Sequence, residues 1–243
     1  ILLLLLIFAP AATSFAAPPT GQIHIGWAMT SITPEQPVAL AGQFHKRISE
    51  RVESPCTATV LAIETRKGEQ SLEQAIMVSC DLVLIADHLQ PRLRKMLAGR
   101  LPGFDPKKLF LNATHTHTGP VTRAIGWYSV DDKGVMKPPA YVDFMLKKIA
   151  AAIESAWTNR APGGVSWGLG HAVVGSNRRM VYRTAQGQPP FGGGTAKMYG
   201  SNKIPAFLSV EGSEDTGIEM LFFWNTKKEL TGCVLNVACP SQV

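Results

Sequence analysis

The sequence predicts a mixed α/β fold of the α+β kind that is rich in β-strands. In the first half of the chain, apolar β-branched segments typical of strands are interleaved with two segments of helical spacing. In the second half, short strand-like segments follow one another between turn residues, as in successive hairpins. The 243 residues, 45% of them hydrophobic, are enough for one large domain with a substantial core.

The first half is expected to contain four strands. They are Gly21–Thr33, Cys56–Thr65, Gln74–Ile85 and Leu109–Ala113. Arg66–Glu69 has the composition of a hairpin turn between the second and third of them. The stretch between the first two strands is loop-like, and Gly42 is available there for a turn.

Two segments are expected to form helices. Asp87–Leu97 has apolar residues on one side, and Pro91 fits only in the first turn of such a helix. Ala140–Asn159 carries a single apolar stripe at intervals of three and four residues. The small residues and proline of Ala161–Gly164 are expected to end it.

The second half is expected to be almost entirely β. The predicted strands are Val165–Val174, Arg179–Thr184, Pro205–Gly212, Ile218–Thr226 and Leu230–Ala238. A glycine-rich loop around Phe191–Gly194 and a hairpin turn at Lys227–Glu229 separate some of them.

The N-terminal residues differ from the rest of the chain. Residues 1–17 combine a short apolar segment of about 10 residues with small residues, as in a secretory signal peptide without its basic n-region. This predicts a secreted or periplasmic protein. A buried N-terminal strand is the alternative. Residues 18–243 are then expected to be part of one domain that continues beyond Val243, because the strand near the C-terminus is followed by only a few residues.

The distribution of charged residues and the spacing of the cysteines give no sign of a nucleic-acid site or of a cysteine-based zinc site. Lys and Arg exceed Asp and Glu by 24 to 18, but the basic residues are scattered, which favours a solvated basic surface over a phosphate-binding stripe. Nothing in the sequence suggests nucleic-acid recognition. The four cysteines, Cys56, Cys80, Cys233 and Cys239, contain no CxxC pair, and three disulfide pairings are possible. Cys80 and Cys233 lie in apolar segments and are expected to be buried.

His115 and His117 are the most informative residues of the chain. They follow the apolar strand Leu109–Ala113 and precede Gly119-Pro120, which stops the strand. In an extended strand, alternate side chains point to the same side, so both imidazoles are expected on one side of the backbone. Two such imidazoles make half of a zinc site. Alternatively, one imidazole binds metal and the other acts on the substrate.

Two other kinds of metal site that contain a His-x-His are less compatible with the surroundings of this pair. A surface or core pair of histidines is the ordinary alternative. Sites of the metallo-β-lactamase type continue to an Asp-His pair, whereas this chain continues with Thr116, His117, Thr118 and Gly119. Amidohydrolase barrels follow their His-x-His with regular βα repeats, which the β-rich second half does not supply.

The stretch NATHTHTGP, residues 112–120, closely resembles the His-Thr-His signature of the neutral/alkaline non-lysosomal ceramidases. Other segments resemble elements of that family in the same order: residues 26–44, 57–64, 75–85, 175–184 and 218–242. The resemblance extends over nearly the whole chain after the leader, and only the His-Thr-His element is highly specific. It implies the N-terminal part of a β-rich ceramidase catalytic domain with flanking helices.

The resemblance also implies a zinc amidase and roles for individual residues. It places His115 as a zinc ligand, His117 beside the scissile amide, and Arg178 in the active site, where it orients polar groups or binds an oxyanion. A surface salt bridge is the alternative for Arg178. The family's second zinc histidine is replaced by Cys239, which is either a thiolate ligand or inert. The remaining ligands and the catalytic serine are expected beyond Val243.

The leading hypothesis is therefore an exported zinc-dependent amide hydrolase acting on ceramide-like lipids or other N-acyl small molecules. A secreted, non-catalytic binding protein with the same fold is the second hypothesis, and a metallohydrolase of esters or glycans is the third. The net charge of +6 is compatible with peripheral contact with an acidic membrane surface.

Overall fold

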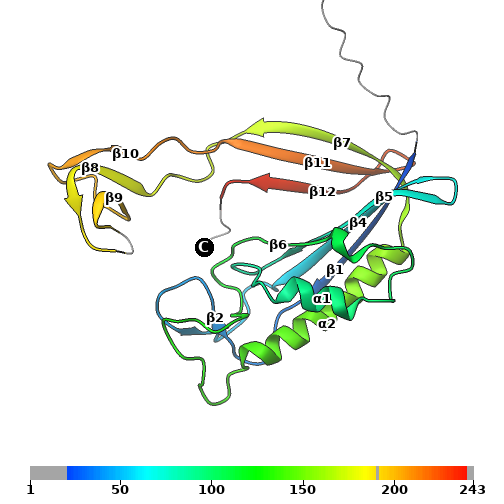
Figure 1. Cartoon of the computed structure of the whole chain (residues 1–243), viewed down its shortest axis with the longest axis horizontal. Coiled ribbons are helices and arrows are strands. Elements are labelled where there is room, and N and C mark those ends of the chain that lie inside the picture. Colours follow the sequence, from blue (N-terminus) through cyan, green and yellow to red (C-terminus); the bar gives the residue numbers. More distant parts are fainter. Residues whose placement is uncertain (1–20, 190–191, 240–243) are drawn as a thin grey trace, which may run out of the picture.

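A computed structural model describes residues 21–189 and 192–239; the predicted leader, residues 1–17, lies outside them (Figure 1). The strands are β1 (Gln22–Ser31), β2 (Ala39–Leu40), β3 (Arg47–Ile48), β4 (Thr57–Lys67), β5 (Gln70–Cys80), β6 (Leu109–Ala113), β7 (Ala161–His171), β8 (Arg179–Gln186), β9 (Gly194–Met198), β10 (Phe207–Val210), β11 (Gly217–Asn225) and β12 (Leu230–Val237). The helices are α1 (Leu89–Met96) and α2 (Pro138–Thr158), and a 3-10 turn spans Pro106–Lys108. The strand-rich α+β class is confirmed.

The main sheet has seven strands in the order β12-β11-β7-β1-β4-β5-β6. Strands β1, β4 and β5 are antiparallel neighbours, and β5 continues through α1 into β6, which pairs with it in parallel. Strands β10-β8-β9 form a second sheet and β2-β3 a third. The parallel β5–α1–β6 crossover places the end of β6 beside the end of β5.

The core lies between the two helices and one face of β1, β4, β5 and β6. Alternate residues of the strands point to this face, and the apolar stripe of α2 packs over them. The helix lies so close to the sheet that a Cβ atom at Gly26 would come within 2.0 Å of the carbonyl oxygen of Ala156. The hydroxyl of Tyr141, which is fully buried, donates to the carbonyl of Ile32 at 3.0 Å.

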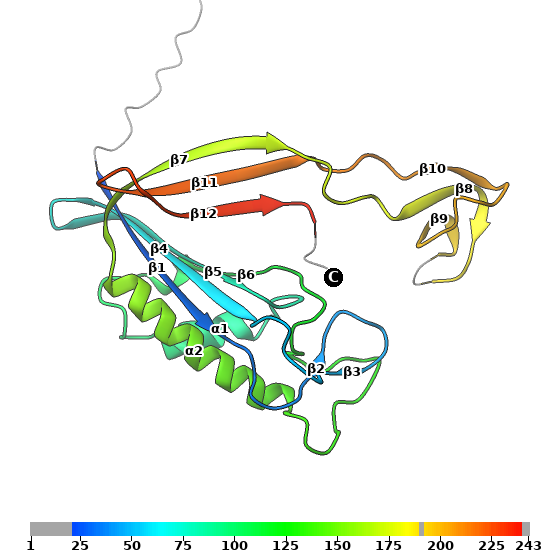
Figure 2. The ribbon, with the colours of Figure 1, turned by 180° about the vertical axis from the view of Figure 1, so that it is seen from behind.

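Strands β7, β11 and β12 form the other half of the main sheet. This half pairs with β1 only at His24–Pro162 and Ile25–Ala161, and from there the two halves diverge (Figures 1 and 2). A small cluster around Ile25, Leu61 and Phe223 packs at the junction. Beyond the far end of β7, the β10-β8-β9 sheet extends as an arm.

Several predicted boundaries are wrong, and tertiary contacts explain two of the differences. Strand β5 starts at Gln70 and stops at Cys80 instead of Ile85, because the carboxylate of Asp81 binds the backbone of β4 there. Ala161–Gly164 begins β7 rather than forming a loop, since Pro162 pairs with β1. Strand β9 occupies part of the glycine-rich region expected to be a loop.

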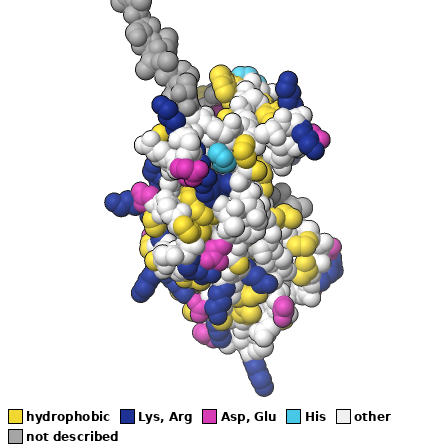
Figure 3. Space-filling model, turned by 90° about the vertical axis from the view of Figure 1, so that its right-hand side faces the viewer, with side chains coloured by type: hydrophobic (Ala, Val, Ile, Leu, Met, Phe, Trp, Pro, Cys, Tyr) yellow, Lys and Arg dark blue, Asp and Glu magenta, His cyan; other side chains and the backbone are white. Residues whose placement is uncertain are grey.

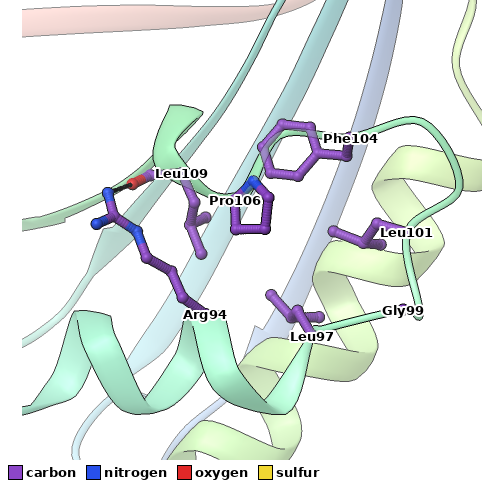
Figure 4. A pocket seen from close by; sticks show the side chains of 7 residues that line it. All are labelled: Arg94, Leu97, Gly99, Leu101, Phe104, Pro106 and Leu109. Atoms are coloured by element: carbon purple, nitrogen blue, oxygen red, sulfur yellow. Dashed lines mark hydrogen bonds between the residues drawn. The ribbon is translucent and has the colours of Figure 1, made fainter.

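The two cysteines that the sequence predicts to be buried differ in their exposure. Cys80 is buried, as expected, whereas Cys233 is exposed, contrary to expectation. A cavity of about 30 Å³ lies between α1 and the start of β6, at the opposite end of that strand from His115 (Figure 4). Arg94 on its wall donates to the carbonyls of Lys107 and Leu109, which ties α1 to β6.

On the face shown in Figure 3, basic side chains are scattered among acidic and hydrophobic ones. This distribution agrees with the solvated basic surface expected from the sequence. Neither α1 nor α2 is long and apolar enough to cross a lipid bilayer.

A buried ion pair joins α2 to the sheet. Glu64 on β4 is 5% exposed and lies 2.9 Å from the guanidinium of Arg160 and 2.7 Å from that of Arg66. Burial alone would raise the pKa of the Glu64 carboxyl. Hydrogen bonds with Arg66, Ser71 and Arg160 outweigh that effect, and the pKa lies below its ordinary value.

Replacing Glu64 by Gln is expected to lower the free energy of unfolding at pH 7 by about 3 kcal/mol, because Arg160 is left buried without a counter-charge. The folded-state pKa is below the unfolded value of about 4.3, so this contribution is complete above that pH and disappears as the pH falls through the folded-state pKa. Urea unfolding at pH 7 and pH 3 measures the difference, which should shrink at pH 3.

Glu73→Gln is the matched control. Glu73 pairs with Lys108 on the surface, so this variant should change the free energy of unfolding much less. Equal losses in the two variants at pH 7 would contradict the assignment.

Candidate functional site

The two histidines meet at a turn, not along a strand. Strand β6 ends at Ala113, and the amide of Thr114 still donates to the carbonyl of Cys80 at 3.0 Å. His115 then has φ +60°, a left-handed conformation that is uncommon for a residue with a side chain. The ring centroids of His115 and His117 are 5.0 Å apart. The pair therefore comes together as expected, but through this turn and not through strand alternation.

Asp81 fixes the strand ends around this turn. Its carboxylate accepts hydrogen bonds from the amide and hydroxyl of Thr57, at 2.8 and 2.9 Å, and from the hydroxyl of Thr114 at 3.2 Å. One side chain thus connects the start of β4, the end of β5 and the end of β6. Hydrogen bonds to a carboxylate are stronger than those between neutral groups. The three bonds of Asp81 hold Thr114 in place and so help to maintain the unfavourable backbone conformation of His115, which follows it.

A second segment holds His117 from the other side. The amide of Ala41 donates to the carbonyl of Gly119, and the amide of Val121 donates to that of Ala39, both at 2.9 Å. Gly42 has φ +93°, and a Cβ atom there would come within 2.4 Å of Cγ of His117. Only glycine satisfies both the backbone conformation and this contact.

Arg47 contacts both the segment around Ala41 and the loop that contains His117. Its guanidinium donates to the carbonyl of Ala41 at 2.9 Å and to the carbonyl of His117. Sequence reasoning missed Arg47 and Asp81, since a lone Arg in a loop-like stretch and an Asp after an apolar strand have many ordinary explanations. From the sequence, Gly42 is expected only to allow a turn.

The electrostatics of the site favour a neutral His117. Partial burial lowers the pKa of His117, and the charges of His115, Arg47 and Arg178 lower it further, against a weaker opposing hydrogen bond with the backbone of Gly42. A neutral imidazole can accept a proton, accept a hydrogen bond or ligate a metal. The charge of Arg178, which precedes β8, therefore acts at this site although it is distant in sequence.

Arg178 and Cys239 lie in neighbouring segments of the second half of the chain. Asn177 anchors the Arg178 segment, because its side chain donates to the carbonyl of Glu211 at 2.8 Å and accepts from the amide of Arg179 at 2.9 Å. Cys239, just after β12, lies beside Gly175 in that same segment.

The described residues do not by themselves form a complete zinc site. The imidazoles of His115 and His117 have the donor atoms that zinc prefers, but zinc sites in proteins use three or four protein ligands. Within residues 21–189 and 192–239, no three His, Cys, Asp or Glu side chains form a group that could hold a metal ion, so Cys239 does not complete one with the two histidines.

A hollow of about 440 Å³ adjoins His117 across Gly42. Its walls are mostly apolar and come from two loops, residues 41–44 and 121–127, and from Val83 and Leu84 after β5. Phe44 and Trp127 stack on each other across the two loops, with ring centroids 4.3 Å apart, and about half of each side chain is exposed. The site thus combines two imidazoles with an apolar recess.

Gly42→Ala is expected to lower the free energy of unfolding by about 2 kcal/mol and to displace the ring of His117, because the new methyl group occupies the position of that ring. Urea unfolding measures the first effect and the chemical shifts of the His117 ring the second. Gly68→Ala is the matched control, since Gly68 also has a positive φ but has no atom within 4 Å of the added Cβ. Equal effects of the two substitutions on both measurements would show that contact with His117 contributes nothing.

Comparison with known proteins was made on sequence and on structure. No protein-family model matches the chain, and no curated protein sequence matches it. The structure is similar to that of neutral ceramidase from Pseudomonas aeruginosa, with a TM-score of 0.66 and 20% identity over 91% of this chain and 32% of that one. It is similar also to a structure described as ceramidase complexed with C2, with a TM-score of 0.65, 20% identity and the same coverage.

The chain therefore spans about a third of the length of the ceramidases that it resembles in structure. The described residues have the fold of the corresponding part of neutral ceramidase.

Proposed function

We propose that the protein is an exported, zinc-dependent hydrolase that cleaves the amide bond of N-acylated lipids of the ceramide type. The observation that carries this proposal is the contact between His115 and His117 at the end of β6, in a fold similar to that of neutral ceramidase. His115 is the proposed zinc ligand and Cys239 a candidate second ligand. The chain covers 32% of the neutral ceramidase chain, so the proposal assigns roles only to residues of this part.

The residues of this chain have distinct proposed roles. A bound zinc ion supplies Lewis acidity for polarising the amide carbonyl or activating the nucleophile. His117, neutral at neutral pH, accepts a hydrogen bond or proton next to the scissile amide. Arg178 binds the oxygen that becomes negatively charged in the tetrahedral intermediate.

The hollow beside His117 is the proposed recess for the apolar part of the substrate. Its volume of about 440 Å³ is within the range of ligand pockets, and its lining includes Phe44, Val121, Ile125 and Trp127. The net charge of +6 favours transient contact with an anionic membrane surface, where a lipid substrate is found.

His115→Ala is expected to abolish zinc binding and reduce hydrolysis of a fluorescent ceramide to background, because an essential ligand is lost. Zinc content by atomic emission on the purified full-length protein is the first measurement, with about one zinc per chain expected in the wild type. His171→Ala, in an exposed histidine at the end of β7, is the control and should retain zinc.

Cys239→Ala distinguishes the two roles of the cysteine. Loss of zinc identifies a ligand, and full retention leaves His115 as the assigned ligand while Cys239 is inert. A wild-type protein that stays free of zinc after the metal is supplied would replace the hydrolase proposal with a non-catalytic binding protein.

Trp127→Ala is expected to raise KM for a long-chain N-acyl substrate by about tenfold and to affect a short-chain analogue much less, because the indole forms one wall of the recess. Steady-state kinetics with acyl chains of two lengths measures this difference. Trp167→Ala is the control, since Trp167 on β7 is 80% exposed and does not line the hollow. Equal changes in KM for both chain lengths would remove the acyl chain from this recess.

A further inference from the structure

Arg178 is held by an aromatic ring. Its guanidinium carbon lies 5.3 Å from the centroid of Tyr199, and the amide of Tyr199 donates to the carbonyl of Arg178 at 3.0 Å. Arg178 comes just before β8 and Tyr199 just after β9, and the pairing of Arg179 with Met198 brings these two positions together. The contact is therefore built into the pairing of the arm.

Tyr199 adopts a conformation that its sequence alone would not favour. Its φ is +58°, which costs roughly 1–2 kcal/mol for a residue with a side chain. The next residue, Gly200, packs so closely on the buried Tyr182 that a Cβ atom would lie 1.9 Å from the Tyr182 hydroxyl, which donates to the carbonyl of Ser201 at 3.0 Å. The surrounding packing thus imposes this turn and directs the ring of Tyr199 to Arg178.

The N–H groups of Arg178 stay available for hydrogen bonds because its partner is an aromatic ring and not a carboxylate. The neighbouring Arg179 takes the carboxylate of Glu211, with an N–O distance of 3.0 Å. In the described part of the chain, no carboxylate lies within 4 Å of the Arg178 guanidinium. A ring face attracts a guanidinium without accepting its in-plane N–H groups in conventional hydrogen bonds, whereas a carboxylate would accept two of them.

We infer that Tyr199 is a positioning residue that holds Arg178 beside the histidine pair while leaving its N–H donors free for a carboxylate or carbonyl oxygen of the ligand. This inference rests on the proposed role of Arg178 in substrate binding. It adds to the site a residue just after β9 that makes no contact with the reacting atoms.

The test measures binding of hexanoate, a carboxylate of the kind that amide hydrolysis releases, to the full-length protein by titration calorimetry with EDTA present. Tyr199→Leu removes the ring but keeps a side chain at the same backbone angle, and it is expected to raise Kd about fivefold. Tyr199→Phe keeps the ring face and should bind as the wild type does. Circular dichroism confirms that each variant is folded.

Substitution in the Arg178→Ala background shows whether Tyr199 acts through Arg178. There, Tyr199→Leu should have no further effect on Kd, because the group that it positions is absent. The inference is overturned if Tyr199→Phe weakens binding as much as Tyr199→Leu does, or if the effect of Tyr199→Leu persists without Arg178. It is overturned equally if the wild-type protein does not bind hexanoate.

Amide hydrolysis is assayed separately. A protein that shows the Tyr199–Arg178 coupling in hexanoate binding but no hydrolysis would end the proposed function and keep the inference. A protein that hydrolyses the amide but lacks the Tyr199–Arg178 coupling would end the inference and keep the proposed function.

Discussion

The carboxylate of Asp81 ties together the start of β4 and the ends of β5 and β6. Its hydrogen bonds to Thr57 and Thr114 end β5, align the start of β4, and fix the residue before His115. Strand β6 could otherwise continue its parallel pairing along β5, and His115 and His117 would then both extend along the strand. The left-handed turn at His115 depends on this anchor, and so does the contact between the two imidazoles.

The rest of the site is assembled from segments that are remote in sequence. Residues 39–42 bridge to the loop after His117 and bring Gly42 and Arg47 against it. The same two loops form the apolar hollow, and Phe44 and Trp127 stack on each other across them. Arg178 approaches from the far end of β7. The helical core bears none of these groups and serves as the rigid support for the strand ends.

Local sequence patterns predicted most of the fold. Strand β6, helix α2, the hairpin β4–β5 and the strand-rich second half were each evident from apolar periodicity and turn residues. The errors arose where tertiary contacts override local signals: the Pro-Gly start of β7 pairs with β1 and β11, and Asp81 ends β5 early.

The site was predictable only in part. His115, His117 and Arg178 were chosen from the sequence, and the structure brings the two imidazoles together and lets Arg178 act on His117. Asp81, Arg47 and Tyr199 could not be chosen, because their importance lies in partners that are 24 to 70 residues away or in a backbone angle. Cys239 as a zinc ligand stays a prediction.

The narrow junction between the two halves of the main sheet has a mechanical consequence. Strand β7, with 11 residues, is about 35 Å long and pairs with β1 only at its first two residues, so this pairing is the pivot for any rotation of one half against the other. By simple proportion, a rotation of about 3° at that pivot moves the far end of the strand by about 2 Å, enough to break a hydrogen bond between Arg178 and a ligand. A change in packing at this pivot, far from the imidazoles, would therefore alter the distance between the cationic and imidazole halves of the site.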